Sequence, residues 1–228
     1  MRGRSCNRRA ALGGALLIGL AAWAAPASAD TQTTPAVTIS ALGDSLVQGF
    51  GLPMEDGFVP VLQDWLQARG HDVRVTNAGV SGDTTAGGRA RIDWTLADDP
   101  DAMIVALGGN DLLRGIDPAE SRANLDAILT EAAKADVPVL LAAMPAPGNY
   151  GPDFERDFAA IYPELAAEHE VLLYENFLQP ITDRIEAGDS VADLLQDDRI
   201  HPNADGVQRI VEAIGPKVEK LIFRAGTS

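Results

Sequence analysis

Three residues in this sequence stand in a pattern that could support nucleophilic catalysis. Ser45 lies in the segment LGDSL and follows the apolar run 37–42, so it would lie at the end of a buried strand. His201 is one of three histidines, and Asp198 precedes it by three residues in the segment DDRIHPN. A hydroxyl nucleophile, an imidazole base and a carboxylate that orients the base are the groups that acyl transfer requires. We therefore consider Ser45, His201 and Asp198 as candidate catalytic residues.

The same chemistry needs hydrogen-bond donors for the negative charge that develops on a carbonyl oxygen. The backbone N–H groups of Ser45 and Gly79 and the side-chain amide of Asn110 are candidates, because each follows an apolar run. Taken singly, each residue has an ordinary explanation. Ser45 could belong to a turn, Gly79 could supply a left-handed backbone angle, and Asn110 could cap a helix. Only their combination indicates an oxyanion site.

These candidates come from four separate segments, so the fold must bring them together. Apolar and β-branched runs predict strands within 37–42, 71–79, 101–111, 137–147 and 171–176. Amphipathic patterns predict helices within 58–70, 84–97, 118–137, 153–170 and 204–224. This alternation predicts an α/β fold, with a doubly wound parallel sheet covered by helices on both faces. Ligands bind outside the carboxyl ends of such strands, which is where the candidate residues would meet.

The chain of 228 residues is predicted to hold one catalytic domain, over 37–224, after a linker at 30–36. Residues 1–29 have a basic start, an apolar stretch and the small residues Ala27, Ser28 and Ala29, a pattern typical of a signal peptide. We expect cleavage near Ala29 and export to the periplasm or the medium, with no membrane anchor retained. The alternative is an anchor, because residues 10–29 carry no charge and could span a bilayer.

Charge and cysteine content limit the partners. The only cysteine is Cys6, so no internal disulfide can form. Removal of residues 1–29, with their four arginines, would take the formal net charge from −15 to −19. Such a surface repels nucleic acid and anionic membranes. We therefore expect no nucleic-acid partner.

Four segments, LGDSL, NAGVSGDTT, ALGGND and DDRIHPN, resemble in sequence and order the signature blocks of the SGNH, or GDSL, hydrolases. The chain is most similar to the secreted thioesterase I, lysophospholipase and arylesterase subgroup. The resemblance covers residues 37–222 and implies a three-layer α/β/α fold of flavodoxin-like type, with no metal or cofactor. It places Ser45, Gly79, Asn110 and His201 at the four naming positions and Asp198 at the triad acid.

The strand-end loops also offer residues for an acyl-binding pocket, namely Leu112, Leu113, Ile116, Met144, Pro145 and Tyr150. Apolar pockets discriminate weakly by chain length, so we expect breadth across acyl and aryl esters, thioesters and lysophospholipids. One alternative is a carbohydrate acetylesterase, which would need a more polar cleft with aromatic residues. Another is a non-catalytic lipid-binding protein, which would be expected to lack one of the catalytic residues. All five catalytic positions hold the residue type that the reaction needs, which favours an esterase.

Overall fold

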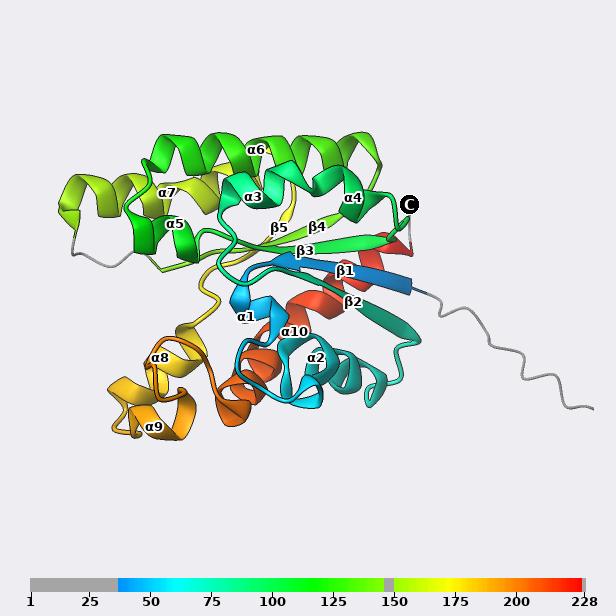
Figure 1. Cartoon of the computed structure of the whole chain (residues 1–228). Coiled ribbons are helices and arrows are strands. Elements are labelled where there is room, and N and C mark those ends of the chain that lie inside the picture. Colours follow the sequence, from blue (N-terminus) through cyan, green and yellow to red (C-terminus); the bar gives the residue numbers. More distant parts are fainter. Residues whose placement is uncertain (1–36, 146–149, 227–228) are drawn as a thin grey trace, which may run out of the picture. The chain divides into compact units, whose positions relative to one another are not determined.

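A five-stranded parallel sheet in the order β2-β1-β3-β4-β5 forms the centre of the protein (Figure 1). The strands are β1 (Val37–Gly43), β2 (Val73–Gly79), β3 (Ala102–Ala106), β4 (Val139–Ala142) and β5 (Leu172–Tyr174). The structure, a computed structural model, describes residues 37–145 and 150–226. The predicted signal peptide 1–29 and linker 30–36 lie outside the described residues.

Strand β1 is the point at which the strand order reverses. The chain passes from β1 to β2 on one side and then crosses to β3 on the other. In the register, Gly43 at the end of β1 is level with Gly79 of β2 and Ala106 of β3. The segments that follow these three strands therefore emerge side by side, at the crevice where doubly wound folds bind ligands.

Helices cover both faces of this sheet, which confirms the predicted α/β/α layers. The helices α3 (Thr85–Ala90), α4 (Ile92–Leu96), α6 (Pro118–Lys134) and α7 (Pro152–Glu168) lie on the upper face in Figure 1. The opposite face carries α2 (Phe58–Gln67) and α10 (Ala204–Ala225). The remaining helical segments are α1 (Ser45–Gln48), η1 (Met54–Asp56), α5 (Gly109–Arg114), α8 (Gln179–Glu186) and α9 (Val191–Leu194).

The core follows from the hydrophobic pattern. All five residues of β3 are buried, because helices cover both faces of this central strand. Along α10, buried apolar residues recur every three or four positions, as expected for a helix packed on one side; they are Val207, Ile210, Val211, Ile214, Val218 and Leu221. Gly215 of α10 packs against Trp65 of α2, and a Cβ there would lie 2.5 Å from the indole ring.

One predicted helix is divided. The expected helix at 84–97 is broken at Arg91, whose backbone leaves the helical region at φ −122° and ψ 11°, so that α3 and α4 are separate. The break turns the Arg91 side chain toward the strand ends, as described below. Within 37–145 and 150–226, no helix is long and apolar enough to cross a bilayer.

Candidate active site

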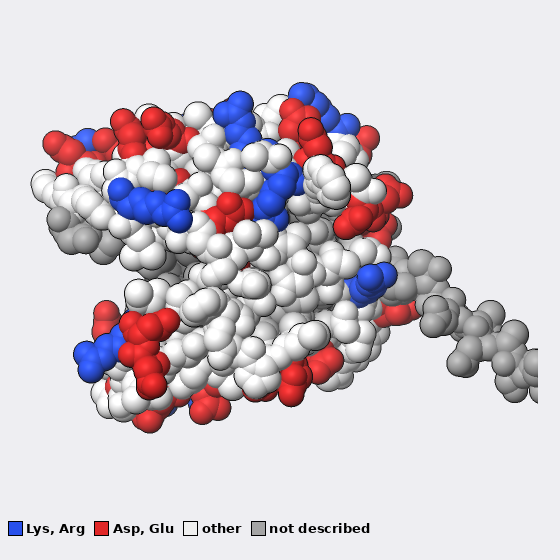
Figure 2. All heavy atoms as spheres, viewed as in Figure 1, with Lys and Arg blue, Asp and Glu red and all other residues white. Residues whose placement is uncertain are grey.

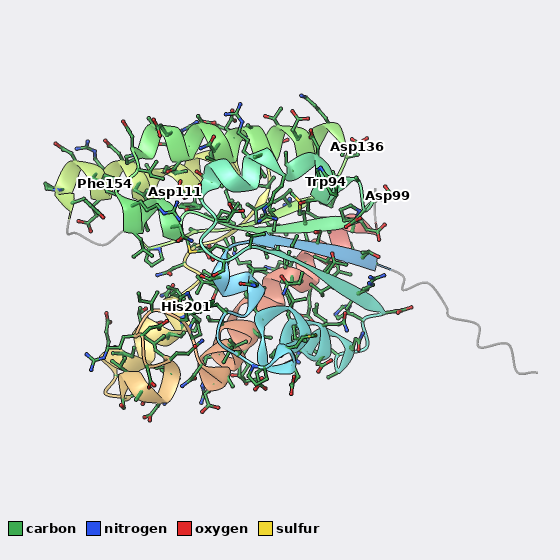
Figure 3. The ribbon with its side chains drawn as sticks, in the orientation of Figure 1. Trp94, Asp99, Asp111, Asp136, Phe154 and His201 are labelled. Carbon is green, nitrogen blue, oxygen red and sulfur yellow. The ribbon has the colours of Figure 1, made fainter. Side chains whose placement is uncertain are left out.

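Ser45 and His201 meet at the carboxyl end of β1. Ser45 is the first residue of α1, and 8% of its surface is exposed. The Nε2 atom of His201 lies 2.9 Å from the Ser45 Oγ atom, although 156 positions separate the two residues in sequence. In Figure 3, His201 lies below the sheet, on the loop that leads into α10. The contact has the geometry that a base needs to remove a proton from a hydroxyl.

Asp198 completes a chain of polar contacts through His201. Its Oδ2 atom lies 2.6 Å from the Nδ1 atom of His201, while Oδ1 accepts hydrogen bonds from the backbone N–H groups of Ile200 and His201. The His201 side chain above all, and then these two backbone donors, lower the pKa of Asp198 to about 2. The carboxylate is therefore ionised at neutral pH, and it fixes the Nδ1 side of the imidazole as the donor.

Asn110 is held beside Ser45 by a second carboxylate. Asn110 lies in the first turn of α5, and its Nδ2 atom donates to the Asp44 Oδ2 atom at 3.3 Å. Asp44 caps α1 by accepting from the Leu46 N–H at 3.0 Å. Only 2% of Asp44 is exposed, and burial raises its pKa to about 6 against the opposing effect of these two hydrogen bonds. An amide nitrogen carries two hydrogens, so Asn110 keeps one for a ligand.

The prediction of Gly79 as an oxyanion donor is not supported, because its N–H already donates to the Asn77 Oδ1 atom at 2.9 Å. Gly79 also packs against the backbone of α1, and a Cβ would lie 2.4 Å from the Gln48 nitrogen. Gly82, three residues further on, lines the cleft together with Ser45 and Asn110. Among the described residues, the Gly82 N–H has no hydrogen-bond partner. Gly82 therefore replaces Gly79 as the third candidate donor.

Arg91 ties the strand ends around Ser45 to one another. Its Nη2 atom donates to the Gly43 carbonyl at 2.8 Å, and Nη1 donates to the Ala78 carbonyl at 2.6 Å. Its Nε atom donates to Asp83 at 2.7 Å, next to Gly82. The planar guanidinium thus joins β1, β2 and the Gly82 loop with three hydrogen bonds. Sequence analysis did not single out Arg91, because its partners lie 8, 13 and 48 positions away and two of them are backbone carbonyls.

Asp111 joins α5 to two neighbouring helices through hydrogen bonds. This fully buried carboxylate accepts from the Thr85 N–H and hydroxyl, at 2.9 and 2.5 Å, and from the Ser121 hydroxyl at 3.0 Å. These contacts attach the start of α5, which carries Asn110, to α3 and α6. Asp111 is part of α5, and in Figure 3 it lies on the other side of the sheet from His201.

A cleft of about 550 Å³ opens beside Ser45 and His201, within the range of small-molecule sites. Figure 2 shows the hollow on the side where α5 and α7 face α8 and α9. Five of the six predicted acyl-binding residues line it, namely Leu112, Leu113, Met144, Pro145 and Tyr150. Ile116 does not line it, because α5 ends at Gly115 in a left-handed conformation that turns the chain away. The prediction missed Leu46, Leu178 and Ile200.

No group of three or more His, Cys, Asp or Glu residues within the described part of the chain could hold a metal ion.

A serine hydroxyl in contact with an imidazole, at the carboxyl edge of a parallel α/β sheet, is an arrangement found among serine hydrolases as a class. A family model described as the GDSL-like Lipase/Acylhydrolase family matches residues 41–209. The chain therefore belongs to this family, also called the SGNH hydrolases, and it is a carboxylic ester hydrolase.

Individual relatives agree with this assignment. The chain is 37% identical to "Esterase TesA" of Pseudomonas aeruginosa over 84% of its own length and 92% of that protein. It is 34% identical to "Thioesterase 1/protease 1/lysophospholipase L1" of Escherichia coli, over 84% of this chain and 88% of the relative. The crystal structure of AlinE4, an SGNH-hydrolase family esterase, matches with a TM-score of 0.67 and 41% identity, over 82% of this chain and 97% of the other.

Proposed function

We propose that Ser45 is the nucleophile of a serine esterase, with His201 as its general base and Asp198 as the residue that orients the base. The observation that carries this proposal is the contact of 2.9 Å between the Ser45 Oγ and His201 Nε2 atoms. The contact of 2.6 Å from His201 to Asp198 on its other nitrogen supports it. The base would therefore present its unprotonated nitrogen to the hydroxyl.

The reaction would follow the order of acyl transfer through a covalent intermediate. His201 takes the proton of Ser45 as the hydroxyl oxygen attacks the ester carbonyl, and Asp198 stabilises the resulting imidazolium. The backbone N–H groups of Ser45 and Gly82 and the Asn110 amide would donate to the oxyanion. His201 then gives its proton to the departing alcohol or thiol. Water, activated by the same imidazole, releases the acid from Ser45.

The cleft supports a substrate with an apolar acyl chain. Its exposed lining is mostly apolar, with leucine, isoleucine, methionine and proline side chains beside the nucleophile. We propose acyl and aryl esters, thioesters and lysophospholipids as the substrate range. The names of the two relatives above, an esterase and a thioesterase that is also a lysophospholipase, support this range. Tyr150 is the only tyrosine, phenylalanine or tryptophan in the described lining, which offers little stacking surface for an acetylated sugar.

We also propose that residues 1–29 are a signal peptide and that the mature enzyme acts outside the cytoplasm. The support is the sequence pattern alone, with its basic start and its small residues before Asp30. N-terminal sequencing of the protein purified from its native host tests this proposal. A mature chain that begins near Asp30 is expected, and a chain that retains Arg2 to Arg9 in the membrane fraction would contradict it.

A hydrolysis panel with the wild type and Ser45→Ala tests the catalytic proposal. The panel should hold p-nitrophenyl esters from acetate to decanoate, an acyl thioester, a lysophosphatidylcholine and an acetylated xylooligosaccharide. We expect medium-chain esters and thioesters to be cleaved faster than the acetylated sugar, and Ser45→Ala to be inactive on all of them. Retention of most turnover by Ser45→Ala would exclude this nucleophile. A strong preference for the acetylated sugar would favour a carbohydrate acetylesterase.

A further inference from the structure

The side-chain amide of Gln196 bridges the two segments that carry the proposed base and nucleophile. Its Nε2 atom donates to the Phe50 carbonyl at 2.8 Å and to the Pro202 carbonyl at 2.9 Å. Pro202 directly follows His201, and Phe50 lies just after α1, which begins at Ser45. Both hydrogens of the amide are therefore used, one toward each segment.

On the side of the base, Gln196 belongs to a loop that is closed on itself. Leu195 and Pro202 form an antiparallel bridge, and the Gln196 N–H donates to the His201 carbonyl at 2.8 Å. The Gln196 carbonyl accepts from the Arg199 N–H at 2.9 Å. These contacts fix the shape of the loop, and with it the Asp198–His201 pair. They do not by themselves fix the distance of the loop from Ser45.

On the side of the nucleophile, Phe50 is joined directly to Ser45. The Phe50 N–H donates to the Ser45 carbonyl at 3.1 Å, and its carbonyl accepts from Gln196. The Phe50 ring also packs against the imidazole of His201, with 4.7 Å between the ring centres. A continuous path of hydrogen bonds thus runs from Ser45 through Phe50 and Gln196 to the residue after His201.

We propose that Gln196 is a positioning residue, which holds the His201 loop at the distance from Ser45 that proton transfer requires. The inference rests on the proposed roles of Ser45 and His201. Besides the Gln196 bond to Phe50, the only hydrogen bond between the described residues 195–202 and 43–52 is the reacting pair itself. That pair cannot hold itself in place while its proton moves. A displacement of about 1 Å between reacting groups can lower a rate about 100-fold.

The first test replaces the amide and separates chemistry from folding. Gln196→Met keeps the length of the side chain and removes both donors, and Gln208→Met on the exposed surface of α10 is the matched control. Rates are normalised to the number of active sites that a p-nitrophenyl phosphonate titrates. We expect Gln196→Met to lower kcat about 10- to 100-fold with KM within twofold and an unchanged far-UV spectrum, and Gln208→Met to match the wild type. An unchanged normalised kcat in Gln196→Met would overturn the proposal, as would a loss explained entirely by fewer titrated sites.

The second test disturbs the contact between Gln196 and Phe50 by a substitution in the segment that follows α1. Gly51 has φ +76°, and a Cβ there would lie 2.2 Å from the Oε1 atom of Gln196. Gly51→Ala therefore displaces the amide and also strains its own backbone. The backbone strain should be the same in the wild type and in Gln196→Ala, so a double-mutant cycle separates it from the displacement of the amide. We expect Gly51→Ala to lower kcat much less in Gln196→Ala than in the wild type. A decrease in kcat by the same factor in both proteins would refute the positioning role of Gln196.

These outcomes are separate from failure of the catalytic proposal. If Ser45→Ala is inactive while Gln196→Met and the cycle show no effect, only the positioning role is wrong. If Ser45→Ala remains active, the proposed function is wrong whatever the Gln196 variants do.

Discussion

Asp44 offers a case in which one substitution should lower catalysis and also change how stability depends on pH. Its carboxylate accepts from Asn110 and from the Leu46 N–H, in a setting that leaves the residue 2% exposed. Burial raises the pKa from 3.8 to about 6 in the folded protein. Holding the charged form in the fold therefore costs about 3 kcal/mol at neutral pH.

The pH dependence follows from the direction of this change. Between about pH 4 and 6 the folded chain keeps a proton on Asp44 that the unfolded chain has released, so the free energy of unfolding falls as the pH rises. In Asp44→Asn this contribution is absent. The stability of the variant relative to the wild type should therefore increase by about 2 kcal/mol between pH 4.5 and 7.5. Any constant cost of placing an amide there is the same at both values and cancels.

The same variant should be a poorer enzyme. An asparagine at 44 that still accepts from Leu46 would turn its own NH₂ group toward the amide of Asn110, and two donors cannot pair. Asn110 would then lose its orientation toward the oxyanion. The loss in kcat should approach the factor of about 10²–10³ that one missing oxyanion donor costs.

Urea unfolding at pH 4.5 and 7.5, with ester kinetics at pH 7.5, measures both effects. Asp64→Asn, an exposed carboxylate on α2, is the control and should change neither quantity. A stability difference between Asp44→Asn and the wild type that is equal at the two pH values would refute the account of the buried charge. An unchanged kcat would refute the role of Asp44 in orienting Asn110.

Four further predictions test other parts of the site. Asp198→Asn should lower kcat by about 10³-fold or more at neutral pH, while steady-state kinetics of its neighbour Asp197→Asn should match the wild type; the reverse result would move the acid by one residue. Asn110→Ala should lower kcat about 10²–10³-fold with little change in KM, and a change in KM alone would make Asn110 a substrate-binding residue. Arg91→Met should lower both kcat and the melting temperature, since it releases three hydrogen bonds at the strand ends, and calorimetry showing wild-type stability would contradict this. Leu113→Ser should lower kcat/KM for p-nitrophenyl octanoate several-fold more than for the acetate, because Leu113 lines the cleft, and an equal loss on both esters would remove it from the acyl site.

Sequence reasoning brought together those candidate residues that lie in local sequence patterns. Ser45 and Asn110 each follow a buried strand, and the parallel arrangement of those strands requires their ends to meet at one edge. Asp198 and His201 share a loop at a spacing that suits a direct contact, and the structure has them 2.6 Å apart. The alternation of strands and helices was sufficient for the fold class, because the hydrophobic periodicity differs between the two.

The parts that it missed depend on contacts between distant segments. Gly79 looked suitable as a donor, but the side chain of Asn77 folds back onto its N–H, a choice that no periodicity records. Ile116 was misplaced because the turn at Gly115 changes the direction of the chain. Arg91 and Gln196 donate to backbone carbonyls, most of them in other segments of the chain, and a carbonyl carries no residue-type signal. Such positions can be identified only from a structure, which shows the segments that follow the strands next to one another.

The most direct test of the central claim is to identify the residue that becomes covalently modified. The protein is treated with a p-nitrophenyl alkylphosphonate, which a serine nucleophile attacks in place of an ester, and the product is analysed by intact-mass and peptide mass spectrometry. We predict one adduct per chain, located on Ser45, with activity lost in proportion to its formation and no adduct in Ser45→Ala. An adduct on another residue such as Ser81, or full activity in a chain modified at Ser45, would contradict the account.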